Sequence, residues 1–143
     1  MIRHMLAFMV LCFLSSGSWG ASYGPYSLTA PIAIDGDTIR ADVMIWPGLV
    51  ADVSIRVIGV DTPEIGQAKC ELEKERGIAA MNFTNAWLAA RIPISINTVR
   101  IDKYAGRIDA VVLGSGGEWL SAALIKSGHG RPYNGGTRQS WCQ

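Results

Sequence analysis

The chain has 143 residues, which is enough for one domain with one hydrophobic core. Its 13 Lys and Arg residues are balanced by 12 Asp and Glu residues. This balance argues against a protein that binds nucleic acid through bulk positive charge. Any recognition of phosphate must therefore come from a local site.

Residues 1–20 have the pattern of a secretory signal peptide. Arg3 and His4 give a short polar start, residues 5–14 are a continuous apolar run, and residues 15–20 supply small side chains before a cleavage site. The run is too short to span a bilayer as a helix; an apolar N-terminal helix of a soluble protein is the alternative. We expect an exported chain, secreted or periplasmic, with no stable membrane anchor. Removal of this segment takes away one Arg and no acid, which leaves 12 basic and 12 acidic residues.

Hydrophobic periodicity over residues 21–143 predicts a single, mainly β domain with two helices. Alternating β-forming residues indicate strands, and apolar residues three, four or seven positions apart indicate a long amphipathic helix. The expected strands are 27–34, 38–46, 51–60, 94–101 and 107–113, the expected helices are 69–91 and 118–127, and 130–143 is expected to be mostly irregular. This order fits a five-stranded OB-type barrel with one long helix and one short C-terminal helix. An α+β open sheet with the helix across one face is the alternative.

The same periodicity predicts which side chains face the core. A strand with one buried face shows every second residue apolar, whereas a helix shows a stripe of apolar residues. The residues expected to face inward are Ile39, Ala41, Val43 and Ile45 on the second strand, and Leu72, Ala79, Phe83, Trp87 and Ala90 on the long helix.

The stretch 56–64 brings one cation and two carboxylates to the end of a predicted strand. Pro63 has no amide hydrogen and biases the preceding residue away from helix, so the strand stops there. Asp61 and Glu64 therefore lie where a strand passes into a loop, which is the usual position for chemistry on a rigid scaffold. An arginine such as Arg56 beside these acids indicates a phosphate bound next to a hard metal ion. A proline turn and a helix cap, with Arg56 paired to a carboxylate, is the alternative.

Two further polar clusters accompany this stretch. Residues 35–38 read D-G-D-T and residues 102–107 read D-K-Y-A-G-R, and each alone is typical of an ordinary turn or hairpin loop. Taken in order, D-G-D-T, R-x4-D-T-P-E and D-K-Y-x-G-R resemble the signature of the staphylococcal nuclease (thermonuclease) family. The resemblance covers residues 34–128. It implies an OB barrel and calcium-dependent hydrolysis of DNA and RNA, with little sequence specificity and with 3′-phosphate ends.

The resemblance also implies a role for each residue that matches the motifs. Oxygen ligands suit a hard cation such as Ca²⁺, although two carboxylates and a carbonyl could also hold manganese or magnesium. Guanidinium groups suit a phosphate whose charge grows in the transition state. The implied roles are Asp37, Asp61 and the Thr62 backbone carbonyl for Ca²⁺, Arg56 and Arg107 for the scissile phosphate, Glu64 for the attacking water, and Lys103 and Tyr104 for a terminal phosphate. We expect the chain to act on nucleic acid as a monomer.

The chain departs from the family pattern in two places. Ala105 is one residue more than the commonest form of the third motif, so it either moves Arg107 or is absorbed by a small bulge. The segment after Gly128 is much shorter than in the best-known family member. Cys70 and Cys142 are the two cysteines of residues 21–143, and an exported compartment permits a disulfide between them. That disulfide would fix the C-terminal tail; two free thiols are the alternative.

Three functional hypotheses remain from the sequence. The first is the exported nuclease, favoured because the five catalytic and ligand side chains of the motifs are all present. The second is a non-catalytic OB-fold module of the cell envelope that binds nucleic acid or another ligand. The third is an exported protein that uses the barrel in envelope or polysaccharide metabolism, and only the predicted export signal supports it.

Overall fold

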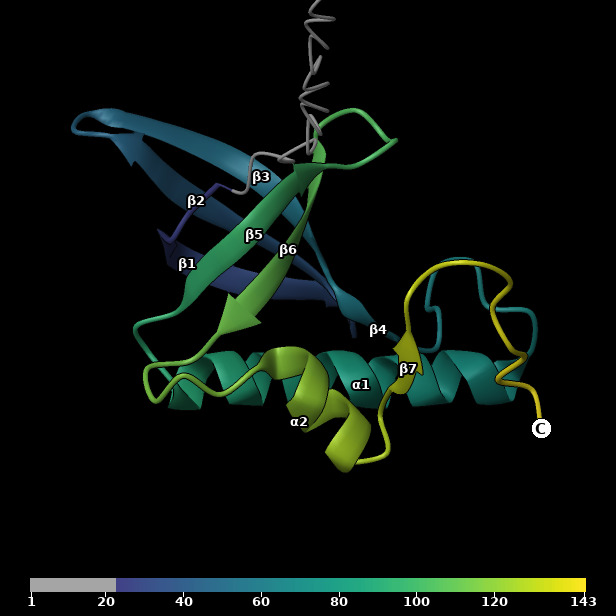
Figure 1. Ribbon diagram of the computed structural model, residues 1–143. Coiled ribbons are helices and arrows are strands. Elements are labelled where there is room, and N and C mark those ends of the chain that lie inside the picture. Colours follow the sequence, from purple (N-terminus) through teal and green to yellow (C-terminus); the bar gives the residue numbers. More distant parts are fainter. Residues whose placement is uncertain (1–22) are drawn as a thin grey trace, which may run out of the picture.

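A computed structural model describes residues 23–143, and the predicted signal peptide at 1–20 lies outside the described residues. The described elements are β1 (Tyr26–Asp35), β2 (Thr38–Trp46), β3 (Leu49–Val57), β4 (Gly59–Asp61), α1 (Glu71–Ala90), β5 (Ser95–Ile101), β6 (Arg107–Leu113), α2 (Leu120–Lys126) and β7 (Arg131–Tyr133). Figure 1 shows a barrel standing on α1, with α2 beside that helix. Neither helix has the length and hydropathy needed to cross a membrane.

Five of the strands close into a barrel in the order β1-β2-β3-β6-β5. The first three form an antiparallel meander. β3 then pairs with β6 in parallel, with Arg56 opposite Asp109, and β5 returns to β1, with Tyr26 opposite Ile96. The closed five-stranded barrel with two helices confirms the predicted fold class at this level and excludes the open sheet. The register brings the end of β1, the start of β2 and the end of β3 together, with Asp35 opposite Thr38 and Thr38 opposite Arg56.

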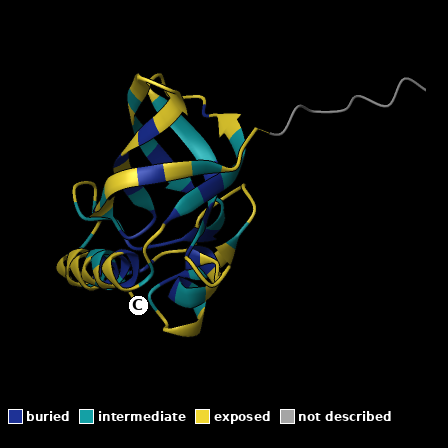
Figure 2. Ribbon diagram, turned by 90° about the vertical axis from the view of Figure 1, so that its left-hand side faces the viewer, coloured by how far each residue is buried: buried dark blue, intermediate teal, exposed yellow. Residues whose placement is uncertain are grey.

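The barrel interior is filled by alternate residues of its strands. Ile39, Ile55 and Ile96 are fully buried, as period-two patterning predicts. Figure 2 shows buried stretches alternating with exposed ones along the barrel strands, and buried positions on one side of α1. Ile45 was expected to face inward but is 50% exposed. It lies near the tip of the β2–β3 hairpin, where residues 44–50 are all exposed and no other element covers the strand.

The buried face of α1 differs from the predicted one. Trp87 is buried and Phe83 is partly buried, but Leu72, Ala79 and Ala90 are exposed. The residues that α1 buries are Glu73, Gly77, Ala80, Thr84, Trp87 and Leu88. Small or polar residues lie at Gly77, Ala80 and Thr84 because this part of α1 packs closely against backbone turns, whereas the large side chains of Trp87 and Leu88 are buried nearer its end.

The predicted third strand, 51–60, is broken in two. Gly59 adopts φ +89°, a conformation that other residues rarely tolerate, and it separates β3 from β4. β4 leaves the barrel and pairs antiparallel with β7, with Asp61 opposite Arg131. The tail 130–143, expected to be mostly irregular, therefore contains a short strand. Sequence periodicity missed both features because the partner of β4 lies about seventy residues away in the chain.

Candidate functional site

The two acidic turns of the sequence meet against α1. A Cβ at Gly36 would lie 2.7 Å from Thr62 Oγ1 and 2.7 Å from Ala80 Cβ, so the three chain segments are in direct contact there. Thr84 of α1 donates a hydrogen bond from Oγ1 to the Gly36 carbonyl at 2.7 Å. This packing brings the first turn, residues 35–38, onto the second, residues 61–64.

The helix also supports the second turn from behind. A Cβ at Gly77 would lie 2.9 Å from the carbonyl oxygens of Pro63 and Glu64. Any larger residue at this position of α1 would push the turn away. The backbone that carries Asp61 and Glu64 is thus held between β4 and the helix.

Carboxylates gather where these turns meet. Asp37 and Asp61 are 4% and 3% exposed, and Thr62, between Asp61 and the proline, is 2% exposed. Arg56 Nη2 donates to Asp37 Oδ2 at 2.9 Å across the end of the barrel. Burial raises the pKa of Asp37; the nearby Arg56 opposes this rise, whereas the negative charges of Asp61 and Glu64 add to it. The cluster of Asp37, Asp61 and Glu64, which we call the acidic centre, therefore carries an excess of negative charge.

Asp35 belongs to this acidic centre, although the family pattern assigns it no role. Its pKa is raised to about 7, mainly by burial and in smaller part by the negative charges of Asp37 and Glu64. The Gly36 amide donates to Asp35 Oδ1 at 2.9 Å and opposes the rise. The sequence carried the signal, since Asp35 opens the D-G-D-T turn, but only the folded turn shows that its side chain faces the other acids.

Two residues of the C-terminal tail reach the same acids, and neither was predicted. Trp141 is buried and donates from Nε1 to Asp61 Oδ2 at 3.1 Å. Arg138 Nε lies 2.9 Å from Asp61 Oδ1, and its Nη1 donates to Glu64 Oε1. No motif marks Arg138 in the sequence; the expected pairing of Cys142 was the only indication that the tail lies nearby.

The acidic centre fits a hard cation. Within residues 23–143, Asp61 Oδ1 is buried and accepts no hydrogen bond, even though the Arg138 charge is close. A buried carboxylate oxygen without a hydrogen-bond donor costs stability unless an ion or water satisfies it. The carboxylate oxygens of Asp37 and Asp61 are the kind of ligand that a hard cation such as Ca²⁺ prefers.

The third motif forms a separate, more exposed loop between β5 and β6. The Asp102 amide donates to the Arg107 carbonyl at 3.2 Å and closes the loop, and Gly106 turns the chain with φ +79°. The extra residue, Ala105, is exposed in this loop. Arg107 donates from Nε to Asp102 Oδ2, so its guanidinium is paired within its own loop.

The two motif arginines nevertheless share one face of the barrel. Ser54 is opposite Arg107 and Arg56 is opposite Asp109 in the β3–β6 pair, so both arginines project from the outer surface of these strands. Around Arg107 the loop is held by stacking on Tyr104, whose ring centre lies 4.8 Å from Arg107 Cζ and 5.1 Å from Lys103 Nζ. Lys103 and Tyr104 are exposed.

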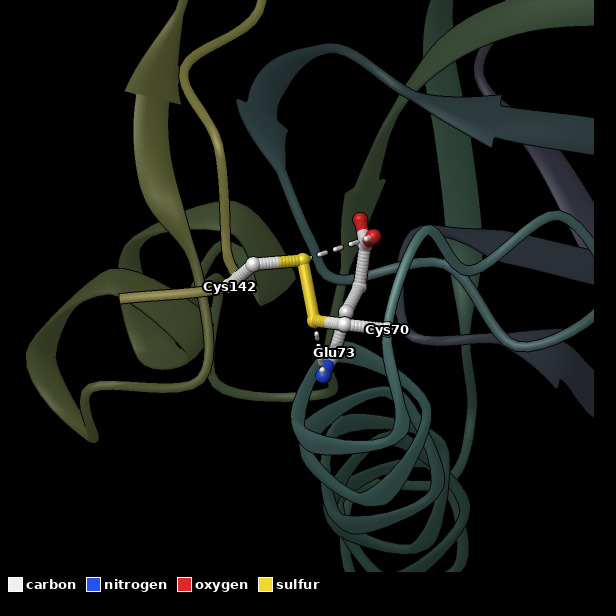
Figure 3. A group of neighbouring side chains, drawn as sticks. All are labelled: Cys70, Glu73 and Cys142. Carbon is white, nitrogen blue, oxygen red and sulfur yellow. Dashed lines mark hydrogen bonds between the residues drawn. A yellow bond between two sulfur atoms is a disulfide. The ribbon is translucent and has the colours of Figure 1, made fainter.

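Cys70 and Cys142 form the predicted disulfide. Figure 3 shows Glu73 beside the two sulfurs, with Cys70 Sγ accepting from the Glu73 amide at 3.4 Å at the start of α1. These three side chains are close enough to share a metal ion. Their sulfurs are bonded to each other, however, and it is the thiolate that ligates metals. Glu73 Oε2 accepts from the Lys69 amide at 2.7 Å. The group is therefore a structural cross-link between α1 and the tail.

Carboxylates, which suit a hard cation, and the Arg56 guanidinium, which suits an anion, therefore lie near one another at this end of the barrel. The chain matches no model of a known protein family, and no curated protein matches its sequence. Functional assignment therefore depends on the residues of the site.

Proposed function

We propose that this chain is an exported OB-type nuclease domain, similar to the staphylococcal nuclease family, which hydrolyses phosphodiester bonds in DNA and RNA with Ca²⁺. The observation that carries the proposal is the meeting of Asp37, Asp61 and Glu64 with Arg56 at one end of the barrel, although they come from separate motifs. The strand order, with its parallel β3–β6 pair, supports the OB-type assignment.

The residues present suit the chemistry of a phosphodiester. This anion repels hydroxide, so a catalyst must neutralise charge and hold a water in line with the scissile bond. Arg56 and Arg107 would grip the phosphate with planar guanidinium groups, and this contact strengthens as charge develops on the phosphate oxygens. To do so, Arg107 would leave its ion pair with Asp102 and bind the substrate phosphate instead.

The acidic centre would hold the cation and handle the water. Asp37, Asp61 and the Thr62 backbone carbonyl would bind Ca²⁺, which when bound supplies positive charge beside the phosphate. Glu64, which is only partly buried, would accept a proton from the attacking water. The exposed Lys103 and Tyr104 would contact a terminal phosphate of the nucleotide.

Export is part of the proposal. The Cys70–Cys142 disulfide supports it, because disulfides persist in oxidising compartments and are rare in the reducing cytosol. A domain that begins after residue 20 would contain all of the described barrel.

The test is cleavage of single-stranded DNA by oxidised protein of residues 21–143, with Ca²⁺ and with chelator. The variant Glu64→Gln keeps the size of the side chain and removes its basicity. Glu75→Gln, at an exposed position of α1, is the matched control. We expect Ca²⁺-dependent cleavage with 3′-phosphate products, a fall of about a hundredfold or more in Glu64→Gln, and no change in Glu75→Gln.

The other outcomes discriminate between the hypotheses. Absence of cleavage by folded, Ca²⁺-binding protein would favour the non-catalytic OB module, and retention of a labelled oligonucleotide would then be measured. Cleavage that survives in Glu64→Gln would show that another group handles the water.

A further inference from the structure

The C-terminal tail crosses directly over the acidic centre, and we call residues 131–143 the C-terminal strap. Its first part, β7, pairs with β4 beside Asp61. Just before it, a Cβ at Gly130 would lie 2.5 Å from Val60 Cγ2, so the strap approaches β4 as closely as backbone allows. In Figure 1 the yellow tail and the teal loop that follows β4 lie side by side.

The far end of the strap is fixed by several independent contacts. The Cys142 disulfide joins it to the start of α1. Arg76 of α1 donates from Nη1 to the carbonyl oxygens of Trp141 and Gln143, each at 2.8 Å. Arg131 stacks over the Trp141 ring, with Cζ 3.7 Å from the ring centre. Both ends of the strap are therefore attached, one through β4 and one through α1.

Between these attachments, Arg138 is the residue that meets the acids. Its guanidinium contacts Asp61 through Nε and Glu64 through Nη1, so one cation pairs with two carboxylates. Its side chain is 34% exposed, whereas that of Asp61 is 5% exposed. Arg138 therefore lies between the buried Asp61 carboxylate and the solvent, on the path by which a metal ion would reach Asp61.

We propose that Arg138 is a further residue of the site: an internal cation, held on Asp61 and Glu64 by the strap, that competes with the divalent cation. This inference rests on the cation-binding role proposed for Asp61. While Arg138 is docked, Asp61 is neutralised and the Glu64 oxygen that would accept a proton is already hydrogen-bonded. Cation binding and docking of Arg138 therefore oppose each other.

The strap determines the strength of this competition. A group tethered at both ends competes at a high effective concentration, so docking does not require a strong ion pair. The coupling is reciprocal, since Ca²⁺ weakens docking by the same factor by which docking weakens Ca²⁺ binding. Loss of the tether at Cys142 should weaken docking, and loss of the Arg138 charge should abolish it.

The direct test is calorimetric titration of the oxidised protein of residues 21–143 with Ca²⁺, which does not depend on nuclease activity. Arg138→Gln removes the competing charge. Lys126→Gln, an exposed residue at the end of α2, makes the same change of charge elsewhere. We expect Arg138→Gln to bind Ca²⁺ about five- to tenfold tighter than wild type, within the usual range of coupling between sites. Lys126→Gln should bind as wild type does.

A second readout follows Arg138 itself. The Nε–H signal that disappears from the ¹⁵N spectrum of Arg138→Gln identifies this guanidinium, and in wild type we expect Ca²⁺ to shift it. Unchanged or weaker Ca²⁺ binding by folded Arg138→Gln would overturn the proposal. An Arg138 Nε–H signal that does not shift when Ca²⁺ binds would overturn it as well. Tighter binding without any DNA cleavage would support the competition while refuting the nuclease.

The role of the disulfide is tested by a double-mutant cycle. Cys142→Ser should tighten Ca²⁺ binding in the wild-type background and have no effect on Ca²⁺ binding when Arg138→Gln is already present. An equal effect in both backgrounds would show that the disulfide does not act through Arg138. If Cys142→Ser fails to fold, removal of the strap contact by Arg76→Gln replaces it in the cycle, with the same expected pattern.

Discussion

The acidic centre and the 102–107 loop carry motifs of similar length but are built in opposite ways. The acidic centre is made by segments distant in sequence, is buried, and is held by α1 and the strap. The 102–107 loop is mostly exposed and is held by contacts within itself, which are the Asp102–Arg107 ion pair, short hydrogen bonds and the stacking on Tyr104. A residue in the first region is positioned by the whole fold, whereas a residue in the second is positioned by its neighbours.

The difference matters for what each region can do. Buried carboxylates that the fold already holds in place can bind a cation strongly, because little solvent reorganises when it arrives. A partly exposed arginine that already has a partner can exchange that partner for a phosphate at small cost. Loss of contacts with α1 or the strap should therefore disturb the geometry of the acidic centre more than that of the 102–107 loop.

The largest expected effect is loss of the disulfide. Cys70 and Cys142 are 72 residues apart, and opening a loop of that length lowers the free energy of unfolding by about 4 kcal/mol in the chain-entropy model. Urea unfolding of oxidised and reduced protein measures the difference. A loss of less than about 1 kcal/mol would mean that Trp141 and Arg76 hold the strap without the covalent bond.

Arg107→Lys should separate catalysis from cation binding. The lysine keeps the charge but loses the planar fork, so kcat/KM should fall about a hundredfold. Because Arg107 lies outside the acidic centre, Ca²⁺ affinity should stay unchanged. Asp61→Asn is the comparison and should lower both quantities. A change in Ca²⁺ affinity in Arg107→Lys would show that the two regions are coupled.

Gly36→Ala should test the packing of the two turns. The added Cβ would meet Thr62 and Ala80 at 2.7 Å, and overpacking of this kind costs about 2 kcal/mol of unfolding free energy. Gly66→Ala is the matched control, because a Cβ there meets nothing within 4 Å. Equal stability of the two variants would contradict the close contact between the turns.

The smallest effect concerns Asp35 and pH in chelator. Its pKa is about 7 in the folded protein and near 4 in an unfolded chain, so the native state loses stability as pH rises from about 4 to 7. Asp35→Asn removes this loss and should stabilise the protein at pH 8 more than at pH 5. The gain should be about 1 kcal/mol at most, because solvent screens this partly exposed group. Unfolding midpoints at both pH values measure it, with the exposed Asp42→Asn as control.

Periodicity alone determined the strands and helices and their order, because alternation and helical spacing are local properties. It failed where the environment of an element is unusual. On α1 the buried face includes Gly77, Ala80 and Thr84, because this part of the helix meets backbone turns. Ile45 is exposed because it lies near the tip of the β2–β3 hairpin. The break at Gly59 depends on a partner strand that local pattern cannot reveal.

The candidate site divides in the same way. The sequence by itself determined the motif residues Asp37, Arg56, Asp61 and Glu64, the alternation that lets the barrel close, and the two cysteines that bond. Only the tertiary structure decided that Asp35 joins the acids and that Arg138 and Trp141 reach Asp61 from the end of the chain. The physical reason is distance along the chain. Contacts between residues some eighty positions apart produce no periodic pattern in the sequence. They form only when β4, α1 and the disulfide bring the strap over the site.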